Sequence, residues 1–482
     1  MRWTLPLALL CCLLTTAALR AAAAAPARPN IVFILADDLG QRDLACYGST
    51  FYETPNLDAL AKSGVRFTDA YAACNVCSPT RASILTGKYP ARIHLTDWLP
   101  GRKDSPQQKM LRPQIQSHLD HREVTVAQAF KEAGYATAFM GKWHLGGREY
   151  YPERFGFDIN VGGCELGHPP SYFSPYKIPT LPDGPKGEYL TDRLTDEACR
   201  FIERTRDKPF LLYLSHYAVH NPQQAKPEIV QHFKDKAQAS RAVEPIFIDD
   251  LGRKVRLVQN HPVYAANLLS LDQSVGRVLA KLKELNLEDK TIVVFTSDNG
   301  GLSTSEGTPT SNFPLRMGKG WNYEGGIREP LIVRWPGVTR AGAICDQPTI
   351  STDFYPTFLD MAGLPPRPTQ HLDGVSITPL LRGDTIPPRP LFWHYPHYSN
   401  QGGGPSAAVR LGDYKLIESL EDDTVQLFNL RQDLSEKTDL SQKEPAKAAE
   451  LLHLLHDWQR SVAASFPTPN PDYRPAKPAK GK

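Results

Sequence analysis

Buried strands that run directly into polar clusters recur along this chain of 482 residues. In NIVFILADD, the residues from Ile31 to Leu35 are apolar, and Asp37 and Asp38 follow them. KTIVVFTSDNG and PFLLYLSHYAVHNP share this layout, and segments with helical periodicity separate these strands. Strands that alternate with helices predict an α/β sheet covered on both faces. Because ligands of such sheets bind beyond the carboxyl ends of the strands, we expect the polar clusters to form one site.

The pattern changes near RGDTIPPRP, which ends at Pro390. Beyond it, LFWHY, AAVRLGDYKLIE and VQLFNL predict short antiparallel strands with tight turns, and EPAKAAELLHLLHDWQRSVAA predicts an amphipathic helix. We therefore expect a large domain over residues 28–384 that holds the site, and a small C-terminal domain over residues 385–465. The last residues, 466–482, have the composition of a disordered tail.

The first 25 residues have the layout of a secretory signal peptide. Arg2 precedes an apolar run from Leu5 to Leu19, and small residues follow this run. The run is shorter than the roughly 20 residues that span a membrane. We therefore expect cleavage near Ala23 or Ala25, and no stable membrane anchor. The sequence predicts a secreted or periplasmic protein, and the absence of any N-x-[ST] acceptor favours a bacterial exported one.

The balance of charge excludes some classes of partner. The chain has 55 basic and 52 acidic residues, and loss of the signal peptide removes two arginines, which leaves 53 basic residues. A nearly neutral protein is not expected to bind nucleic acid or an anionic membrane surface through its overall charge. Six widely spaced cysteines follow the signal peptide, and this spacing does not predict a small disulfide scaffold.

Two cysteine patterns overlap in CNVCSPTRASILTG. Cys74 and Cys77 form C-x-x-C, which could be a redox pair or half of a zinc site, whereas Cys77 also begins C-x-P-x-R. No thioredoxin-like context and no second ligand pair accompany the first pattern, since HLDH at residues 118–121 lies in a polar stretch. Ser78 as a possible N-cap and Gly87 as a stop predict a helix after Cys77. Cys77 would then lie at a helix N-terminus, where negative charge is stabilised.

Several ordered motifs give the chain a strong resemblance to a known family. They are ADD at Asp37, CSPTRASILTGKYPAR at Cys77, GKWHLG at Lys142, AVHNP at His220, TSDNGG at Asp298 and GKGWNYEGGIREPLIVRWPG at Lys319. With these motifs the chain resembles the type I sulfatases of the alkaline phosphatase superfamily. The resemblance covers residues 28–340, and TDFYPTFLDMAG and the C-terminal strands extend it to about 465. It implies an alkaline-phosphatase-like domain with a mixed, mostly parallel central sheet, and a small C-terminal α+β domain with an antiparallel sheet.

The resemblance also implies a chemical role for Cys77. In this family a formylglycine-generating enzyme oxidises the cysteine of C-x-P-x-R to formylglycine (3-oxoalanine), and Cys74 would be a structural neighbour. One oxygen of the hydrated aldehyde attacks sulfur and takes the sulfate, and the other then expels the sulfate. A serine could perform only the first step and would remain as a stable sulfate ester.

The family pattern assigns further roles to residues of this sequence. A Ca²⁺ ion would be held by oxygen ligands and by residue 77 after its conversion. The implied metal ligands are Asp37, Asp38, Cys77, Asp298 and Asn299. Lys142 and Lys319 match the lysines that clamp the sulfate, and Arg81 matches the arginine that orients the diol. His144 matches the residue that takes the diol proton, and His220 matches the one that binds the substrate and protonates the leaving alcohol.

The choice of substrate is less determined than the chemistry. The Asn after Asp298 resembles arylsulfatase-like and galactosamine-sulfatase-like members. The segments GGCELGHPPSYFSPY and FWHYPHYSNQGGGP look most like bacterial polysaccharide sulfatases, some of which remove 4-O-sulfate from galactose-type sugars. Candidates for contact with a sugar are His168, Trp321, His394 and His397, whereas we expect His216 to be a packed residue. Two alternatives stay open, namely a phosphomonoester or phosphonate hydrolase on the same fold and a non-catalytic glycan-binding relative.

Overall fold

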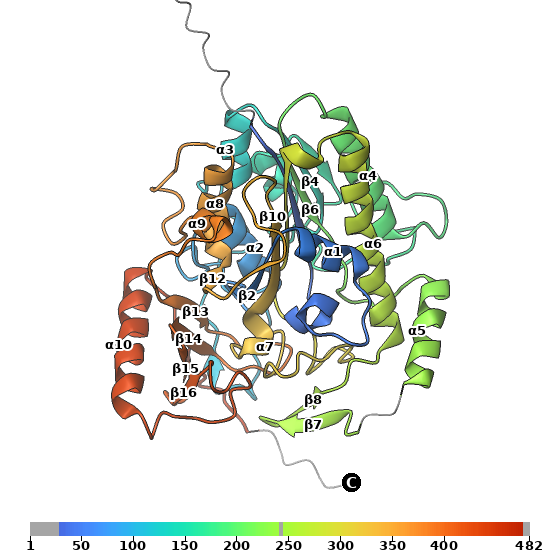
Figure 1. Cartoon of the computed structure of the whole chain (residues 1–482). Coiled ribbons are helices and arrows are strands. Elements are labelled where there is room, and N and C mark those ends of the chain that lie inside the picture. Colours follow the sequence, from blue (N-terminus) through green and yellow to red (C-terminus); the bar gives the residue numbers. More distant parts are fainter. Residues whose placement is uncertain (1–27, 241–243, 476–482) are drawn as a thin grey trace, which may run out of the picture.

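A nine-stranded sheet runs through the larger part of the computed structural model, which describes residues 28–240 and 244–475 (Figure 1). Eight strands follow the order β11-β2-β10-β9-β1-β6-β4-β5, and β12 also pairs with β2. The bounds are β1 Asn30–Ala36, β2 Val65–Tyr71, β4 Ala136–Gly141, β5 Ile159–Val161, β6 Phe210–Ser215, β9 Thr291–Ser297, β10 Arg328–Arg334, β11 Ala343–Cys345 and β12 Thr349–Ile350. Only β10 among these nine runs against its neighbours. The predicted mixed, mostly parallel sheet is therefore confirmed.

Helices cover both faces of this sheet, as its sequence pattern predicts. In β1, Phe33 belongs to one hydrophobic cluster and Ile34 to the other, because successive side chains of a strand point to opposite faces. The face of Ile34 packs against α1 Pro55–Ser63, α4 Leu190–Arg204 and α6 Pro262–Glu284, with α5 Pro227–Ala239 outside α6. The face of Phe33 packs against α2 Cys77–Thr86, α3 Val126–Glu132, α8 Phe354–Met361 and α9 Thr378–Arg382. No helix in the described ranges is long and apolar enough to cross a membrane.

The C-terminal part forms a second, smaller layer. An antiparallel sheet is built from β13 Leu391–Tyr395, β14 Ser406–Leu411, β15 Tyr414–Ser419 and β16 Val425–Asn429. Helix α10 Pro445–Ser461 packs on this sheet, and its Trp458 stacks on Phe392 with ring centroids 4.6 Å apart. The predicted antiparallel strands and amphipathic helix are confirmed.

The C-terminal tail differs from the prediction of disorder beginning at residue 466. Residues 466–475 lie against the body, and β17 Thr468–Pro469 pairs with β3 Met110–Leu111. The backbone N–H of Asn470 also donates to the Lys109 carbonyl at 2.8 Å, although no periodic pattern in the sequence predicts a strand there. Sequence patterns could not predict this strand pairing, because the segment is short and rich in proline and shows no alternation of apolar and polar residues. Residues 476–482 and the predicted signal peptide lie outside the described residues.

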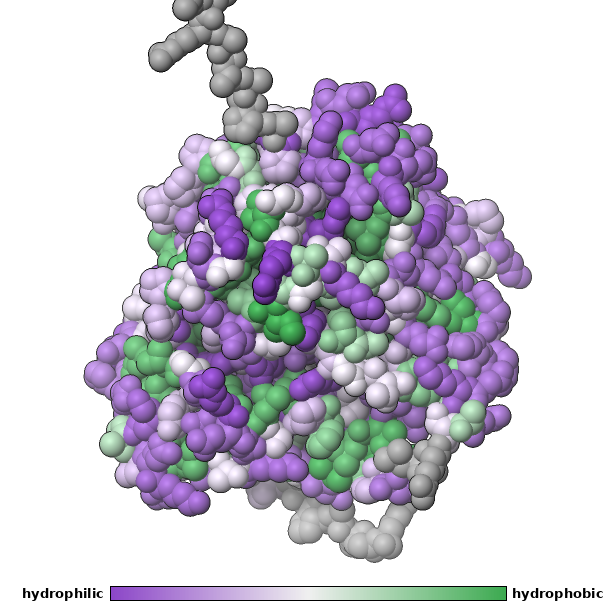
Figure 2. All heavy atoms as spheres, viewed as in Figure 1, coloured by the Kyte–Doolittle hydropathy of each residue, from purple (hydrophilic) through white to green (hydrophobic). Residues whose placement is uncertain are grey.

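Two short elements complete the described structure. A hairpin of β7 Phe247–Asp250 and β8 Arg253–Arg256 extends from the lower edge in Figure 1, and the one-turn helix α7 Glu324–Ile327 precedes β10. Figure 2 shows that hydrophilic residues cover most of this face and that apolar side chains form small, separate patches. One such patch lies over the hairpin, where Phe247, Ile248 and Leu251 are exposed.

Candidate active site

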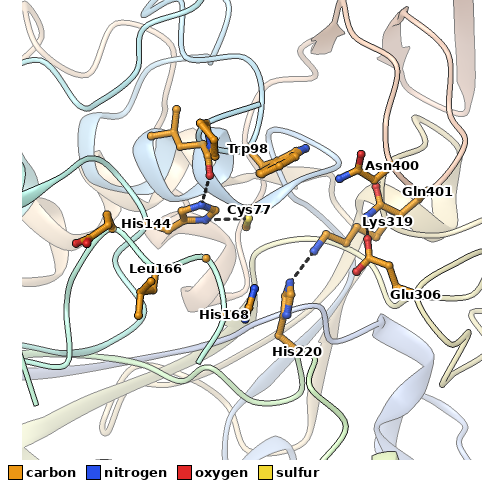
Figure 3. A pocket seen from close by; sticks show the side chains of 14 residues that line it. Cys77, Trp98, His144, Leu166, His168, His220, Glu306, Lys319, Asn400 and Gln401 are labelled. Carbon is orange, nitrogen blue, oxygen red and sulfur yellow. Dashed lines mark hydrogen bonds between the residues drawn. The ribbon is translucent and has the colours of Figure 1, made fainter. Parts of the chain in front are cut away.

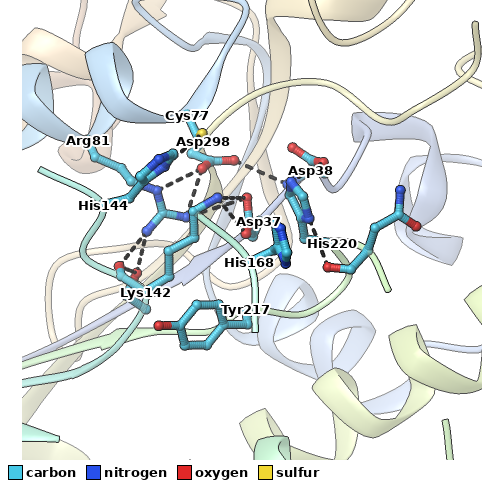
Figure 4. A network of polar contacts seen from close by, with 12 residues as sticks. Asp37, Asp38, Cys77, Arg81, Lys142, His144, His168, Tyr217, His220 and Asp298 are labelled. Carbon is cyan, nitrogen blue, oxygen red and sulfur yellow. Dashed lines mark hydrogen bonds and ion pairs between the residues drawn. The ribbon is translucent and has the colours of Figure 1, made fainter. Parts of the chain in front are cut away.

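The polar clusters that follow the strands meet at one edge of the large sheet (Figure 4). Strands β4, β6, β1 and β9 are adjacent and parallel, so their carboxyl ends lie side by side. Helix α2 and the loop before α7 bring further side chains to this edge. Each of the ten residues that the sequence assigned to the metal, the sulfate or proton transfer contacts at least one other of them: Asp37, Asp38, Cys77, Arg81, Lys142, His144, His220, Asp298, Asn299 and Lys319.

Helix α2 places Cys77 at its first residue, on the floor of a cavity. The helix ends at Gly87, which adopts φ 68°, a left-handed conformation that favours glycine. Ser78 differs from the predicted N-cap, because Val76 occupies that position. The Ser78 hydroxyl instead donates to the His144 carbonyl at 2.9 Å and accepts from the Leu99 N–H at 3.1 Å. Ser78 thus fixes the loops beside Cys77 rather than the helix end.

His144 faces Cys77 in a defined tautomer. Its Nε2 donates to the Leu99 carbonyl at 2.6 Å, so Nδ1 carries the lone pair, and Nδ1 lies 3.3 Å from Cys77 Sγ. Burial, with the nearby Lys142 charge, lowers the pKa of His144 well below its ordinary value, so the imidazole is neutral. Gly167 crosses directly above this ring, where an added Cβ would lie 2.6 Å from Cε1. The arrangement presents a proton acceptor to whatever group residue 77 carries.

Three carboxylates and three cations are buried next to each other at this edge. Lys142 Nζ lies 2.8 Å from both oxygens of Asp37, and Lys319 Nζ lies 2.7 Å from Asp38 Oδ1. Arg81 Nη2 lies 2.7 Å from Asp298 Oδ2, and its Nη1 donates to the Lys142 carbonyl at 2.7 Å. The acidic and basic groups are therefore equal in number. Burial, and then the neighbouring carboxylates, raise the pKa of Asp37 well above its ordinary value despite the Lys142 ammonium.

The donor set fits a hard cation. Asp37, Asp38 and His220 place ligand atoms within 4.8 Å of one another. Asn299 donates its amide to Asp38 Oδ1 at 2.7 Å, whereas its buried Oδ1 has no hydrogen-bond partner. A buried acceptor without a partner is costly, and carboxylate and amide oxygens are the ligands that Ca²⁺ and Mg²⁺ prefer. The residues present therefore fit a divalent ion between Asp37, Asp38 and Asn299.

His220 is poised between a lysine and the cavity. Its Nδ1 donates to the Asn221 carbonyl at 3.0 Å, and its Nε2 accepts from Lys319 Nζ at 3.2 Å. Burial lowers the pKa of His220 well below its ordinary value, although Asp38 acts in the opposite direction. Nε2 is consequently the atom that faces the site.

The cavity above these residues has a volume of about 430 Å³ (Figure 3). Its floor exposes Cys77, His144, His220 and Lys319, whereas Lys142 and Arg81 lie beneath it and do not line it. The walls are Trp98, Leu99, Pro100, Glu165, Leu166, Gly167, His168, Glu306, Asn400 and Gln401. The loop between β13 and β14 supplies the last two, so the C-terminal sheet helps to build the site.

The structure separates the four candidates for sugar contact. His168 lines the cavity, but the other three do not. His394 donates to the Ser465 carbonyl at 2.9 Å, His397 pairs with Thr96 at 2.8 Å, and the Trp321 indole donates to the Gln401 carbonyl at 3.2 Å. For a histidine or aromatic residue in a short strand or turn, the sequence does not show whether the side chain faces a cavity or the protein interior.

Other expectations concern residues near the site. His216 is buried and pairs with the Ser274 hydroxyl at 3.0 Å, as expected of a packed residue. Cys74 is buried and, like the other described cysteines, is not in a disulfide. Sequence reasoning missed wall residues such as Trp98 and Glu306, because they lie in loops without periodicity or a recognisable motif. It singled out the segment that contains Asn400 but not that residue.

Known proteins resemble this chain along most of its length. The Sulfatase family model matches residues 29–364, and the model for the C-terminal part of N-sulphoglucosamine sulphohydrolase matches residues 316–461. Dog (Canis lupus familiaris) N-acetylgalactosamine-6-sulfatase is 32% identical, over 92% of this chain and 83% of that protein. Human arylsulfatase A is 34% identical, over 80% of this chain and 74% of that protein.

A solved structure agrees with these sequence relatives. The crystal structure of Ps i-CgsB in complex with k-i-k-neocarrahexaose superposes with a TM-score of 0.74 at 30% identity, and covers 89% of this chain and 92% of that one. Family models, sequence relatives and the fold are therefore consistent with one another. The chain belongs to the sulfatase family, whose members hydrolyse sulfuric esters.

Proposed function

We propose that this sulfatase is exported and removes O-sulfate from a polysaccharide or oligosaccharide, with residue 77 converted to formylglycine and a bound Ca²⁺ ion. One observation carries the proposal: Cys77 Sγ lies on the floor of the cavity, 3.3 Å from a histidine nitrogen that is free to accept a proton. The Sγ position stands in for the hydrated aldehyde oxygens that would replace it. Burial raises the pKa of the unmodified thiol, so Cys77 itself is a poor nucleophile here.

The chain's own groups fit the steps that such a reaction needs. Formylglycine, when present and hydrated, supplies two oxygens on one carbon, one to take the sulfate and one to expel it. His144 Nδ1 is placed to take a proton at residue 77, because its Nε2 is committed to Leu99. His220 Nε2 is placed to protonate the leaving alcohol. A bound anion would raise the pKa of this imidazole and so favour its acid form.

The cationic groups have distinct positions relative to the sulfate. Lys319 reaches the cavity floor and is placed to bind a sulfate oxygen, while Lys142 approaches from below through Asp37. Arg81 would hold Asp298 and the end of β4 in place. A Ca²⁺ ion held by Asp37, Asp38, Asp298 and Asn299, and by the converted residue 77, would neutralise charge on oxygen and lower the pKa of a bound hydroxyl.

The balance of charge favours sulfate over phosphate. With a divalent ion that keeps Asp37 ionised, the three carboxylates offset the three cations, and the ion leaves a net charge of about two positive units. A sulfate monoester with one ionised oxygen on residue 77 supplies about two negative charges and completes the balance. A phosphate monoester dianion would leave an excess negative charge in a buried site, which is costly. The charge of the site therefore favours a sulfatase over the alternative of a phosphomonoester or phosphonate hydrolase.

The substrate class and the location rest on separate observations. A cavity of about 430 Å³ with an imidazole, an indole and amide groups in its wall suits a sugar unit. The solved relative bound to a neocarrahexaose supports a sulfated galactose-type sugar, with 4-O-sulfate as the first position to test. The N-terminal 25 residues support export to the periplasm or medium. Maturation would require a formylglycine-generating enzyme as a partner.

The test is a panel of matched sulfate and phosphate monoesters on galactose-type and other sugars, with release of the inorganic anion measured. We expect sulfate release to dominate on saccharides. Faster release of phosphate than of sulfate from matched sugars would replace the proposal with the phosphohydrolase alternative. Binding without release of either anion by fully converted enzyme would favour a glycan-binding role.

A further inference from the structure

The wall of the cavity carries charge of one sign only. Glu165 and Glu306 line it, and no lysine or arginine lines it apart from Lys319 on the floor, within the residues that the structure describes. Both glutamates are exposed, whereas the floor residues are buried. A sulfate that reaches the floor therefore brings the rest of its sugar between two carboxylates.

Glu306 is held in position rather than free to move away. Its Oε1 accepts from Gln401 Nε2 at 2.5 Å, and Gln401 is 3% exposed. The Gln401 carbonyl in turn accepts from Thr304 Oγ1 at 3.1 Å and from the Trp321 indole. Figure 3 shows Glu306 beside Lys319 and Gln401, on the side of the cavity away from His144. The carboxylate is thus fixed on the same side of the cavity as Lys319 and His220, the residue proposed to protonate the leaving alcohol.

Glu165 belongs to the other side of the cavity. It accepts a hydrogen bond from the Tyr151 hydroxyl, and it immediately precedes Leu166, which lies near His144 in Figure 3. No ion pair to a lysine or arginine is found for either glutamate among the described residues. Glu165 therefore faces the cavity without a paired cation, and the cation near Glu306 is Lys319, which is placed to bind the sulfate itself.

The remaining wall groups suit hydroxyls and apolar ring faces. The Trp98 indole lines the cavity, and its buried N–H has no hydrogen-bond partner among the described residues. The exposed side chain of Asn400 lines the wall and can donate to or accept from a sugar hydroxyl. The carboxylates of Glu165 and Glu306 can accept hydrogen bonds from sugar hydroxyls. Leu166 and Pro100 add apolar surface. These groups can bind an uncharged sugar, but none of them compensates a second anion.

We infer that the wall selects a sugar whose only anionic group is the sulfate being removed, an inference that rests on the proposed function. A second sulfate or a carboxylate on the same sugar unit would approach Glu165 or Glu306 and be repelled. The repulsion of like charges at this partly solvated separation corresponds to about a threefold to tenfold loss in kcat/KM per carboxylate. Isolated sulfates on otherwise neutral saccharides would be the preferred targets.

The test compares two saccharides that differ only by a second sulfate on the target sugar. At pH 8, where an imidazole is neutral, we expect the wild type to favour the monosulfated sugar by about tenfold or more in kcat/KM. Glu306→Gln and Glu165→Gln should each narrow this ratio severalfold, and the double variant should narrow it further. Glu450→Gln, at an exposed position of α10, is the matched control and should leave the ratio unchanged.

The outcomes separate this inference from the proposed function. Equal or faster turnover of the disulfated sugar by the wild type, or a ratio that neither glutamine variant changes, would overturn the inference alone. No sulfate release from either saccharide or from an aryl sulfate, by enzyme with residue 77 converted, would overturn the proposed function. Thermal unfolding of each variant shows that the fold is kept.

Discussion

Two buried charge clusters have the same numbers of acidic and basic residues but different surroundings. The site cluster contains Asp37, Asp38, Asp298, Lys142, Lys319 and Arg81, and the junction cluster contains Asp69, Glu324, Glu436, Arg328, Arg410 and Lys415. Each has three carboxylates and three cations. The junction cluster connects β2 and β10 of the large sheet with β14 and β15 of the small sheet, whereas the site cluster lies along one edge of the large sheet.

The two clusters differ in whether their polar atoms all have hydrogen-bond or ion-pair partners. In the junction cluster, Lys415 Nζ bridges Glu324 and Glu436 at 2.9 Å each, and Glu436 also accepts from the Glu324 N–H at 2.7 Å. In the site cluster, Asn299 Oδ1 has no partner, and Lys319 reaches a cavity. The junction cluster thus holds the two sheets together, whereas the site cluster leaves polar atoms free to bind a cation and a substrate.

Loss of the nucleophile should give the largest effect and should act on activity alone. Cys77→Ala removes the side chain that would become formylglycine, but alanine fits the start of α2. We expect turnover of an aryl sulfate to fall by at least about 1,000-fold, with an unchanged unfolding temperature. A folded variant that keeps a tenth of the wild-type rate would contradict the assignment.

Removal of the cation should affect the site cluster and not the junction cluster. Exhaustive chelation is expected to reduce turnover at least about 100-fold and to lower the free energy of unfolding by about 2–3 kcal/mol relative to enzyme with ion at 100 times its Kd. Added Ca²⁺ should restore both. Asp298→Ala should lose bound metal and activity together, measured by elemental analysis. Unchanged turnover after chelation would remove the metal site from the account.

The junction cluster should respond in the opposite way. Lys415→Met leaves the buried Glu436 without a cation and Glu324 with Arg328 alone, so we expect a loss of about 3–5 kcal/mol in the free energy of unfolding. The specific activity of the folded fraction should stay near that of the wild type. Adding Glu436→Gln to Lys415→Met should recover part of the loss, because one uncompensated charge is removed. Denaturant unfolding checks both, and an undiminished stability in the single variant would show that this cluster does not hold the two sheets together.

His220 should discriminate between leaving groups. A sugar alkoxide needs a proton to leave, whereas an activated phenol hardly does. His220→Ala is therefore expected to lose about 100-fold or more on a sulfated sugar and less than about tenfold on an aryl sulfate. Steady-state kinetics on both substrates provide the comparison. Equal losses would remove the role as acid and leave His220 as a residue that positions Lys319.

The smallest expected effect is a change in the pH dependence of stability. Burial raises the pKa of Glu436 to about 7, although Lys415 acts in the opposite direction. The folded protein therefore holds a proton that the unfolded chain releases between about pH 4.5 and 7, so this group makes stability fall as pH rises through that window. Glu436→Gln should flatten the slope by at most about 1.4 kcal/mol per pH unit.

A matched variant shows whether the slope belongs to Glu436. Burial also raises the pKa of Asp43 to about 7, and Asp43→Asn should flatten the same window by a similar amount. The two changes should add, because these carboxylates have no shared partner. A slope that Glu436→Gln leaves unchanged would mean that Glu436 is ionised throughout this range.

The site was more predictable than the junction for a physical reason. Asp37 and Asp298 directly follow buried strands, and His220 lies in the loop after β6, so the geometry of a parallel sheet brings them together. Glu324 begins helix α7, just before β10 of the large sheet, whereas Lys415 lies on β15 of the small sheet, and no local pattern connects them. Their pairing depends on how the two sheets dock, which periodicity does not encode.

The cavity wall and the tail had the same limitation. Glu306 and Asn400 come from irregular loops, and their place depends on contacts such as Gln401 with Glu306. His397, which resembled a sugar-binding residue in sequence, is buried against Thr96. The strand pairing of Thr468–Pro469 likewise arises from long-range backbone hydrogen bonds. Patterns predicted the elements and the floor of the site, but not the loops that shape its entrance.

The most direct measurement is the mass of the tryptic peptide from Phe67 to Arg81, taken alongside specific activity. This peptide contains both Cys74 and Cys77, so Cys74 is an internal control for unspecific oxidation. Preparations made with different amounts of a formylglycine-generating enzyme should differ in the fraction of residue 77 that has lost sulfur and gained an aldehyde. The account predicts that specific activity rises in proportion to this fraction and extrapolates to zero without it. Full activity in protein that carries only the Cys77 thiol would contradict it.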